Sequence, residues 1–180
     1  IADQHDLDIV YSNFMKVYDN KPPKYMYKED ESVSVMTSKE MLLMNFTHRV
    51  NVNACTMIAR RRLFDNLKFP EGMYFEDRAF TFRLINAASK CGYVNKAFYH
   101  YYQRSGSIVH KKNWKMYYDF VESDRMRLEF IRDSHLFTQE EKLLAAQKSS
   151  ESILRKLRHL YAKAKTKEQK KQFREMAKNI

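Results

Sequence analysis

Glycine and proline are scarce in this chain, and each occurs only three times among 180 residues. Tight turns depend strongly on these two residue types, because glycine tolerates positive φ and proline fixes a φ that suits a turn. The scarcity therefore predicts few sharp turns and long helices. Hydrophobic residues make up 44% of the chain and aromatic residues 14%, which is enough for a packed core and argues against disorder. The length suits one domain, or one domain with an appendage.

Positive charge is concentrated toward the C-terminus. The formal net charge is +11 at pH 7. Residues 111–180 hold 18 Lys and Arg against 10 Asp and Glu, a net charge of +8, which leaves +3 for residues 1–110. A basic surface suits nucleic acid, anionic lipid or a phosphorylated ligand as a partner.

The cysteines and the apolar runs bear on the cellular location. Cys55 and Cys91 form no disulfide framework and lack the spacing of metal ligands, which predicts a reducing, cytoplasmic compartment. No apolar run in the sequence is long enough to span a bilayer, and no signal peptide is visible. Because the first residue is Ile1 rather than Met, we expect a fragment, a processed chain or an engineered chain.

The first part of the chain predicts a mixed α/β unit, helix-rich and of the α+β kind. The β-branched and aromatic residues of 7–18 and 91–102 are typical of strands. Apolar residues at helical spacing predict helices at about 38–49 and 77–89.

From residue 113 on, the pattern is helical almost throughout. It predicts one helix over 113–133, a second that ends at about residue 164, and a short polar third that starts at Thr166. The composition changes near His110. We therefore predict a first part at residues 1–110 and a basic helical extension at residues 111–180.

Two capping boxes predict where helices begin. Thr37 is followed three residues later by Glu40, and Thr138 by Glu141. In this motif the threonine hydroxyl and the glutamate carboxylate each accept a backbone N–H that the helix itself leaves unpaired. We therefore expect one helix directly after Thr37 and another directly after Thr138.

The stretch FPEGMYFEDRAF, residues 69–80, places Glu76, Asp77 and Arg78 directly after a run of aromatic residues. Neighbours on a helix point about 100° apart, so one carboxylate can act as a base while the other orients or pairs. Both lie at a predicted helix start, where the helix dipole favours negative charge. The alternative is that they are ordinary helix-start charges with Arg78 as a surface ion, and the local pattern alone favours this alternative.

Polar and basic groups gather after the strand predicted at 91–102. Arg104, Ser105, Gly106 and Ser107 offer a guanidinium, two hydroxyls and a flexible backbone, a combination that suits phosphate oxygens. An ordinary polar turn is the alternative. His100 and His110 are candidate metal ligands, although a solitary histidine is more often a hydrogen-bonded structural residue.

Two basic segments are candidate binding surfaces. Residues 60–62 are three consecutive arginines, and the lysines and arginines of 155–174 suit nucleic acid or an anionic membrane surface. Glutamates at positions 140, 141, 151, 168 and 175 lie within and around the second segment, and it lacks aromatic interleaving of the kind used for base stacking. A solvated helix face is therefore the favoured interpretation of both.

Several motifs follow one another in a fixed order over residues 54–108. In chain order they are Arg60-Arg61, Leu63-Phe64, FPEG at 69–72, EDR at 76–78, Tyr93-Val94, Lys96, Tyr99, Tyr102, Arg104 and Ser107. This order, with a strand at 8–11, resembles the C-terminal half of the catalytic domain of family 2 glycosyltransferases. These are GT-A-fold enzymes that build bacterial polysaccharides and related glycans.

The resemblance assigns roles to individual residues. It implies that Asp77 is the catalytic base and that Glu76 orients or holds the acceptor. Tyr74 and Arg78 would bind the acceptor, beside a sugar-binding wall formed by the aromatic run. The Arg104 and Ser107 turn, which the resemblance places near the donor diphosphate, would offset the charge of the leaving group.

The resemblance also implies parts that this chain does not contain. The family carries its nucleotide-binding βαβ units and its D-x-D metal motif in segments that would precede Ile1. We therefore expect a partial GT-A-like mixed sheet with helices, followed by the helical extension. A divalent metal, Mn²⁺ or Mg²⁺, is expected for the complete enzyme, with ligands outside this chain. Where the family usually has a tryptophan and a lysine, this chain has Cys55 and Met57.

The sequence thus predicts a glycosyltransferase of the hexosyltransferase type that is incomplete and inactive as this chain alone. The complete enzyme would transfer a sugar with inversion from a nucleotide diphosphate donor to a hydroxyl of a glycan or lipid-linked acceptor. We expect it in the bacterial cytoplasm, at the inner face of the membrane through the basic extension. The alternative is a non-catalytic basic helical module for nucleic acid or an anionic membrane surface. Nucleic acid is the less favoured partner, because it leaves the motif order unexplained.

Overall fold

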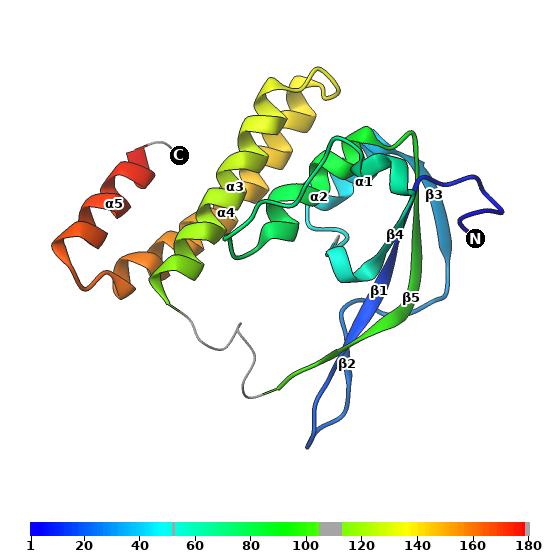
Figure 1. Cartoon of the computed structure of the whole chain (residues 1–180), viewed down its shortest axis with the longest axis horizontal. Helices are drawn as coiled ribbons and strands as arrows, with labels where there is room; N and C mark the ends of the chain where they lie inside the picture. Colours follow the sequence, from blue (N-terminus) through cyan, green and yellow to red (C-terminus); the bar gives the residue numbers. More distant parts are fainter. Residues whose placement is uncertain (52, 105–112, 179–180) are drawn as a thin grey trace.

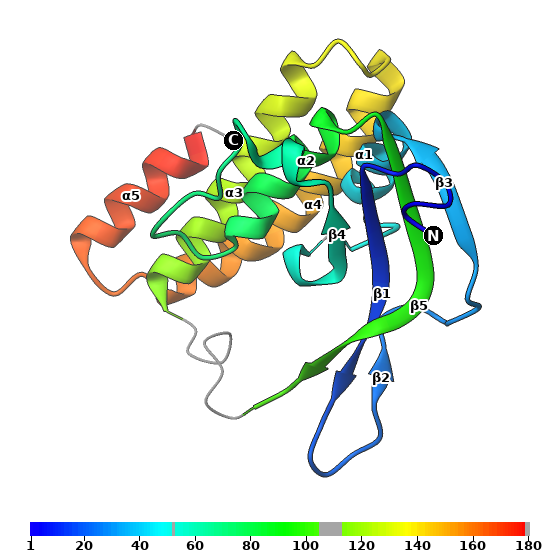
Figure 2. The same cartoon turned by 45° about the vertical axis from the view of Figure 1, so that its right-hand side comes forward.

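Five α-helices and five strands form most of the regular structure of residues 1–51, 53–104 and 113–178, the part of the chain that the computed structural model describes. In chain order they are β1 (Ile9–Val17), β2 (Lys24–Tyr25), β3 (Val33–Thr37), α1 (Ser38–Phe46), β4 (Met57–Ala59), α2 (Glu76–Ala87), β5 (Lys90–Tyr102), α3 (Trp114–Asp133), α4 (Gln139–Lys163) and α5 (Lys167–Lys178). Figures 1 and 2 show α1 and α2 between the sheet and the α3–α4 hairpin.

The sheet is mixed, with β1 and β5 at its centre. The strand order is β2-β1-β5-β3, and β4 pairs with the first residues of β1. β1 and β5 run parallel, whereas β2, β3 and β4 are antiparallel to their partners. Parallel neighbours need a crossover connection, and α2 lies in the crossover here. The strands predicted at 7–18 and 91–102 are confirmed as β1 and β5.

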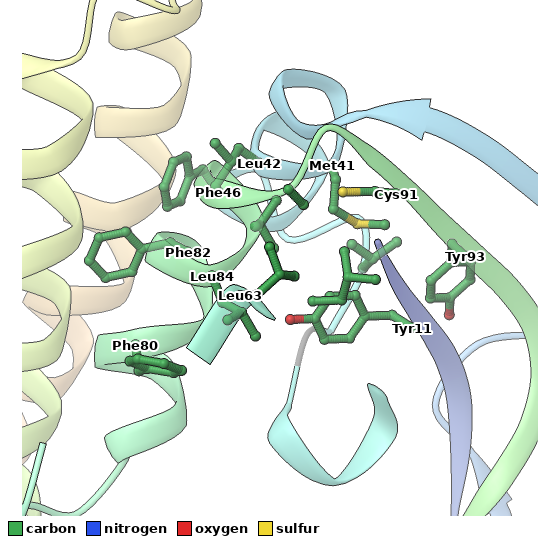
Figure 3. Packing of buried hydrophobic residues seen from close by; sticks show 14 of the residues in the cluster. Tyr11, Met41, Leu42, Phe46, Leu63, Phe80, Phe82, Leu84, Cys91 and Tyr93 are labelled. Carbon is green, nitrogen blue, oxygen red and sulfur yellow. The ribbon is translucent and has the colours of Figure 1, made fainter. Parts of the chain in front are cut away.

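The main core lies between the sheet and the helices. Figure 3 shows side chains of β1, β5, α1 and α2 meeting there, among them Tyr11, Cys91, Met41 and Leu84. All four are fully buried. The helices predicted at about 38–49 and 77–89 are confirmed as α1 and α2, although α1 ends earlier than predicted.

Both predicted capping boxes are present. The hydroxyl of Thr37 accepts the N–H of Glu40, and the hydroxyl of Thr138 accepts the N–H of Glu141, each at 3.2 Å. The two glutamate carboxylates accept the threonine N–H groups, each at 2.8 Å. The helix starts after Thr37 and Thr138 are therefore confirmed.

The predicted helical extension is confirmed as α3, α4 and α5. A hydrophobic cluster that includes Val121, Ile153 and Leu160 joins its helices. Ile131 of α3 and Ala145 of α4 belong instead to the main core. The extension therefore shares apolar packing with the first part, and the division at residue 110 stays a prediction. Within the described residues, no helix combines the length and the apolar character needed to cross a membrane.

A buried polar cluster joins α1, α2 and α3. Arg78 Nε donates to Asp124 Oδ1 at 2.8 Å, and Arg127 Nη1 donates to Asn45 Oδ1 at 2.8 Å. Arg127 Nε also lies 3.7 Å from Asp124 Oδ1, and neither of these two side chains is more than 1% exposed. Because a buried charge is costly without a counter-charge, these contacts fix how the three helices meet.

His48 follows α1 and borders this cluster. Partial desolvation lowers the pKa of His48, although the residue is exposed to solvent, which weakens the effect. The positive charges of Arg78 and Arg127 lower it further, and together these effects outweigh the raising influences of Asp124 and of a hydrogen bond with the backbone of Lys148. A histidine with a lowered pKa in the folded state stabilises the fold above its unfolded value of 6.5. That contribution is lost as the pH falls through the folded value.

We expect acidification from about pH 7.5 to about pH 5.5 to lower the free energy of unfolding, with His48 responsible for part of the loss. His48→Asn should reduce this pH dependence, and asparagine suits the site because the φ of His48 is 59°. Urea unfolding at both pH values measures the effect. His135→Asn, at a histidine between α3 and α4 and away from the Arg78–Asp124–Arg127 cluster, is the control. Equal losses in the parent and His48→Asn would contradict the prediction.

Candidate functional site

The predicted carboxylate pair lies on the wall of a cavity of about 590 Å³. Glu76 and Asp77 form the start of α2, and Tyr74 and Phe75 precede them on the same wall. Among the described lining residues, Glu76 and Asp77 are the charged ones. The carboxylate pair therefore borders a space large enough for a small ligand.

Aromatic and apolar side chains supply much of the remaining wall. Tyr99 and Tyr101 lie two residues apart on β5, with ring centroids 6.4 Å apart, because alternate strand residues share a face. Phe14 of β1 and Met116 of α3 line the cavity as well. A mainly apolar wall with a few polar groups is typical of a small-molecule site.

Two residues with left-handed backbone shape the segment before α2. Gly72 has a φ of 67° and Phe75 a φ of 60°. Glycine adopts this conformation freely, whereas a bulky aromatic residue adopts it only when its surroundings hold it there. The carbonyl of Phe75 accepts the N–H of Ala79 at 3.1 Å, so the left-handed residue is also the N-cap of α2.

Asp77 lies where the cavity meets the buried core. It is half-buried, whereas Glu76 is exposed. Burial raises the pKa of the Tyr11 hydroxyl, and the nearby Cys91 and Asp77 raise it further. Since Tyr11 is fully buried, the charge of Asp77 acts on a low-dielectric region, where electrostatic interactions are stronger than in water.

Cys55, one of the two departures from the family pattern, lies on the cavity wall. Partial desolvation raises the pKa of its thiol although Cys55 is exposed, a hydrogen bond with Tyr99 opposes that change, and the charge of Asp77 adds to it. The thiol is therefore a neutral part of the wall. Met57, the other departure, borders a neighbouring cavity of about 430 Å³ instead.

Arg78 does not join the other predicted residues of the EDR stretch at the cavity. Its guanidinium binds Asp124 of α3 and lies 4.8 Å from the centroid of the Phe120 ring. This arrangement makes Arg78 a bridge between α2 and α3. Its predicted contact with an acceptor has no support from the geometry, and neither has the interpretation as a free surface ion.

The predicted phosphate-binding turn is described only in part. Arg104 is exposed beyond the end of β5 and is not among the described residues that line the cavity. Ser107 lies outside the described residues, as do Ser105, Gly106 and His110. The assignment of Arg104 and Ser107 to the donor phosphates stays a prediction.

We find no metal-binding site in the part of the chain that the structure describes. There, no group of three or more His, Cys, Asp or Glu side chains is placed to hold a metal ion. His100 is exposed on β5. The described residues do not fit a metal, so the expectation of Mn²⁺ or Mg²⁺ concerns the complete enzyme only.

Sequence reasoning missed most of the cavity wall outside residues 74–77. Tyr99 and Tyr101 could have been found, since their spacing of two places them on one face of a predicted strand. Phe14, Asn53 and Met116 carried no local signal, because tertiary packing brings them together from three separate segments.

The extension presents exposed basic side chains. Arg155, Arg158 and Lys163 are exposed on α4. Such a surface suits anionic lipid and nucleic acid alike. The predicted membrane contact and the alternative binding module both remain predictions.

A search of solved structures finds a likeness to S. aureus TarS 1-349 in complex with UDP-GlcNAc. The two chains superpose with a TM-score of 0.61 and share 20% sequence identity. The match covers 97% of this chain and 49% of the TarS chain. At this identity the likeness shows the fold alone. It confirms a glycosyltransferase-like, partial GT-A-like α/β fold with a helical extension.

The chain spans about half the length of the TarS structure that it matches. A scan against known protein families finds no match, and a search of curated proteins finds none either. Neither the assignment to glycosyltransferase family 2, which rests on the motif order alone, nor the activity is shown by these comparisons, and both are matters for proposal.

Proposed function

We propose that this chain is the acceptor-side half of the catalytic domain of a family 2 glycosyltransferase. The complete enzyme transfers a hexosyl group, with inversion, from a nucleotide diphosphate donor to a hydroxyl. One observation carries the proposal: the Glu76–Asp77 pair marked by the motif order lines an aromatic cavity in a chain with a glycosyltransferase-like fold. The TarS structure contains UDP-GlcNAc, which supports a nucleotide-sugar donor here.

Asp77 is the general base in this proposal. In an inverting displacement the acceptor oxygen bonds to the anomeric carbon while the bond from that carbon to the diphosphate oxygen breaks. The acceptor hydroxyl must lose its proton during this step, and a nearby carboxylate can take it. Glu76, about 100° further round the helix, orients or holds the acceptor.

The aromatic wall binds the acceptor sugar. Tyr74, Tyr99 and Tyr101 line the cavity with flat rings that carry a polar hydroxyl at one end. Such rings pack against the apolar C–H face of a sugar and hydrogen-bond its hydroxyls. The acceptor is a glycan or a lipid-linked saccharide.

The donor side lies mostly outside this chain. Arg104 and Ser107 offset the charge of the diphosphate leaving group. The nucleotide-binding units and the metal ligands belong to the complete enzyme, so no step is assigned to a metal here. This chain alone is inactive in this proposal. The exposed basic residues of α4 support a location at the inner face of the bacterial membrane, in polysaccharide synthesis.

Saccharide binding by this chain tests the acceptor site. We expect saturation-transfer NMR with a panel of neutral mono- and disaccharides to give signals in the parent chain. Tyr101→Ala removes a ring from the cavity wall and should abolish those signals. Tyr25→Ala, at an exposed tyrosine of β2 outside the cavity lining, should retain them.

A thermal-shift panel separates this function from the alternative. The panel holds UDP, GDP, CMP and dTDP, each with and without Mn²⁺, beside a short DNA duplex. We expect no nucleotide to stabilise this chain. Metal-dependent stabilisation by one nucleotide would place a donor site in this chain and overturn the half-domain proposal. Stabilisation by DNA without any saccharide signal would favour the basic binding module.

A further inference from the structure

We propose that α3 positions the catalytic turn, residues 74–77, through Asp119 and Phe120. Asp119 acts here as a positioning residue, because it contacts the backbone of the turn rather than the reacting atoms. The role in catalysis rests on the proposed function, whereas the mechanical role rests on contacts within this chain.

Asp119 holds the residue at which the turn begins. Its carboxylate accepts the N–H of Tyr74 at 2.8 Å and the ammonium of Lys115 at 2.6 Å. Asp119 is only 6% exposed. A buried carboxylate that accepts a backbone N–H makes a charge-assisted hydrogen bond, which is stronger than a neutral one. Tyr74 is therefore tied to a helix 45 residues further along the chain.

Phe120, the next residue of α3, holds the left-handed residue of the turn. Its ring meets the ring of Phe75 edge-on, with centroids 5.1 Å apart. The guanidinium of Arg78 and the ammonium of Lys156 lie 4.8 and 4.5 Å from the same ring. Phe75 has no intrinsic preference for a φ of 60°, so contacts of this kind must maintain its conformation.

The direction of the carboxylate pair follows from these two contacts. Glu76 and Asp77 come directly after Phe75, so a change in the backbone angles of Phe75 would swing the first turn of α2. Phe80 and Phe82 anchor the rest of α2 in the core. α2 is thus fixed at its interior by the core and at its start by α3. The extension, which has no counterpart in the motif resemblance, is therefore part of the site's framework.

Amide hydrogen exchange in this chain tests the mechanical role without any activity. Asp119→Ala removes the acceptor, and we expect the Tyr74 amide to exchange about tenfold faster or more. The amide of Ile85 inside α2 should keep its protection, which shows that the fold is intact. Asp119→Asn keeps an oxygen acceptor without the charge and should give a smaller change. Glu122→Gln on the same helix, where the glutamate pairs with Arg125, should change neither amide.

Unchanged exchange at Tyr74 in both Asp119 variants would overturn the proposal. If Asp119→Ala does not fold, Asp119→Asn and Phe120→Leu carry the same test. Phe120→Leu keeps an apolar side chain but removes the ring that holds Phe75, so it should also speed exchange in the turn.

Kinetic measurements on the complete enzyme test whether the positioning by Asp119 matters for catalysis. We expect Asp119→Asn to lower kcat about tenfold or more with the donor KM unchanged, because the base is misplaced while the donor site is intact. Glu122→Gln should retain the parent kinetics. Faster exchange with an unchanged kcat would overturn the positioning role in catalysis. Faster exchange in an enzyme whose parent form transfers no sugar would instead refute the proposed function and leave the mechanical role standing.

Discussion

Asp77→Asn in the complete enzyme should lower turnover by about 10²–10⁴-fold, the usual contribution of a general base. Asparagine keeps the size of the side chain and a hydrogen-bonding oxygen but cannot take the proton of the acceptor hydroxyl. The donor site does not include Asp77 in this proposal, so donor binding should stay nearly intact. Steady-state kinetics for turnover and calorimetry for donor binding measure the two effects separately.

A carboxylate outside the cavity provides the control for this change. Asp65 is exposed and is not among the described lining residues, so Asp65→Asn should leave turnover at the parent level. Glu76→Gln distinguishes the two members of the pair, and we expect it to raise the acceptor KM more than it lowers kcat. Parent-like turnover in Asp77→Asn would refute the assignment of Asp77 as the base.

Asp124→Asn should lower the free energy of unfolding by about 3–5 kcal/mol, since it leaves buried positive charge without its counter-charge. Burial and the charge of Arg78 lower the pKa of Arg127, whereas Asp124 raises it. Without the carboxylate, both remaining influences disfavour the charged guanidinium. Asparagine preserves the shape of the side chain, so the loss reports on charge rather than on a cavity. Urea unfolding followed by the fluorescence of Trp114, the single tryptophan, measures it.

An exposed ion pair on the same helix is the matched control. Asp133 pairs with Arg132, and both side chains are more than 60% exposed. Asp133→Asn should therefore change the free energy of unfolding by no more than about 0.5 kcal/mol. If Asp124→Asn were equally harmless, the cluster that joins α1, α2 and α3 would not depend on charge.

The helices and strands that could be predicted from the sequence are those that depend on contacts between residues close together in the chain. The capping boxes at Thr37 and Thr138 join groups three residues apart, and the helix and strand periods follow from backbone geometry alone. β1, β5 and the five helices were therefore predictable from short windows. The end of α1 was less predictable, because the chain leaves the helix at Thr47 and reaches a left-handed residue at His48.

The residues of the candidate site likewise fall into those that local sequence predicts and those that it does not. The carboxylate pair at the start of α2 and its aromatic neighbours could be predicted from the sequence, because these residues are adjacent in the chain. Tertiary structure alone decided that Arg78 turns to Asp124 rather than to the cavity, that Asp119 holds Tyr74, and that β1 and β5 run parallel. The hydrogen bonds from Arg78 and Tyr74 to α3 span 46 and 45 residues. Contacts of that range depend on how all the apolar faces pack together, and no local pattern records that packing.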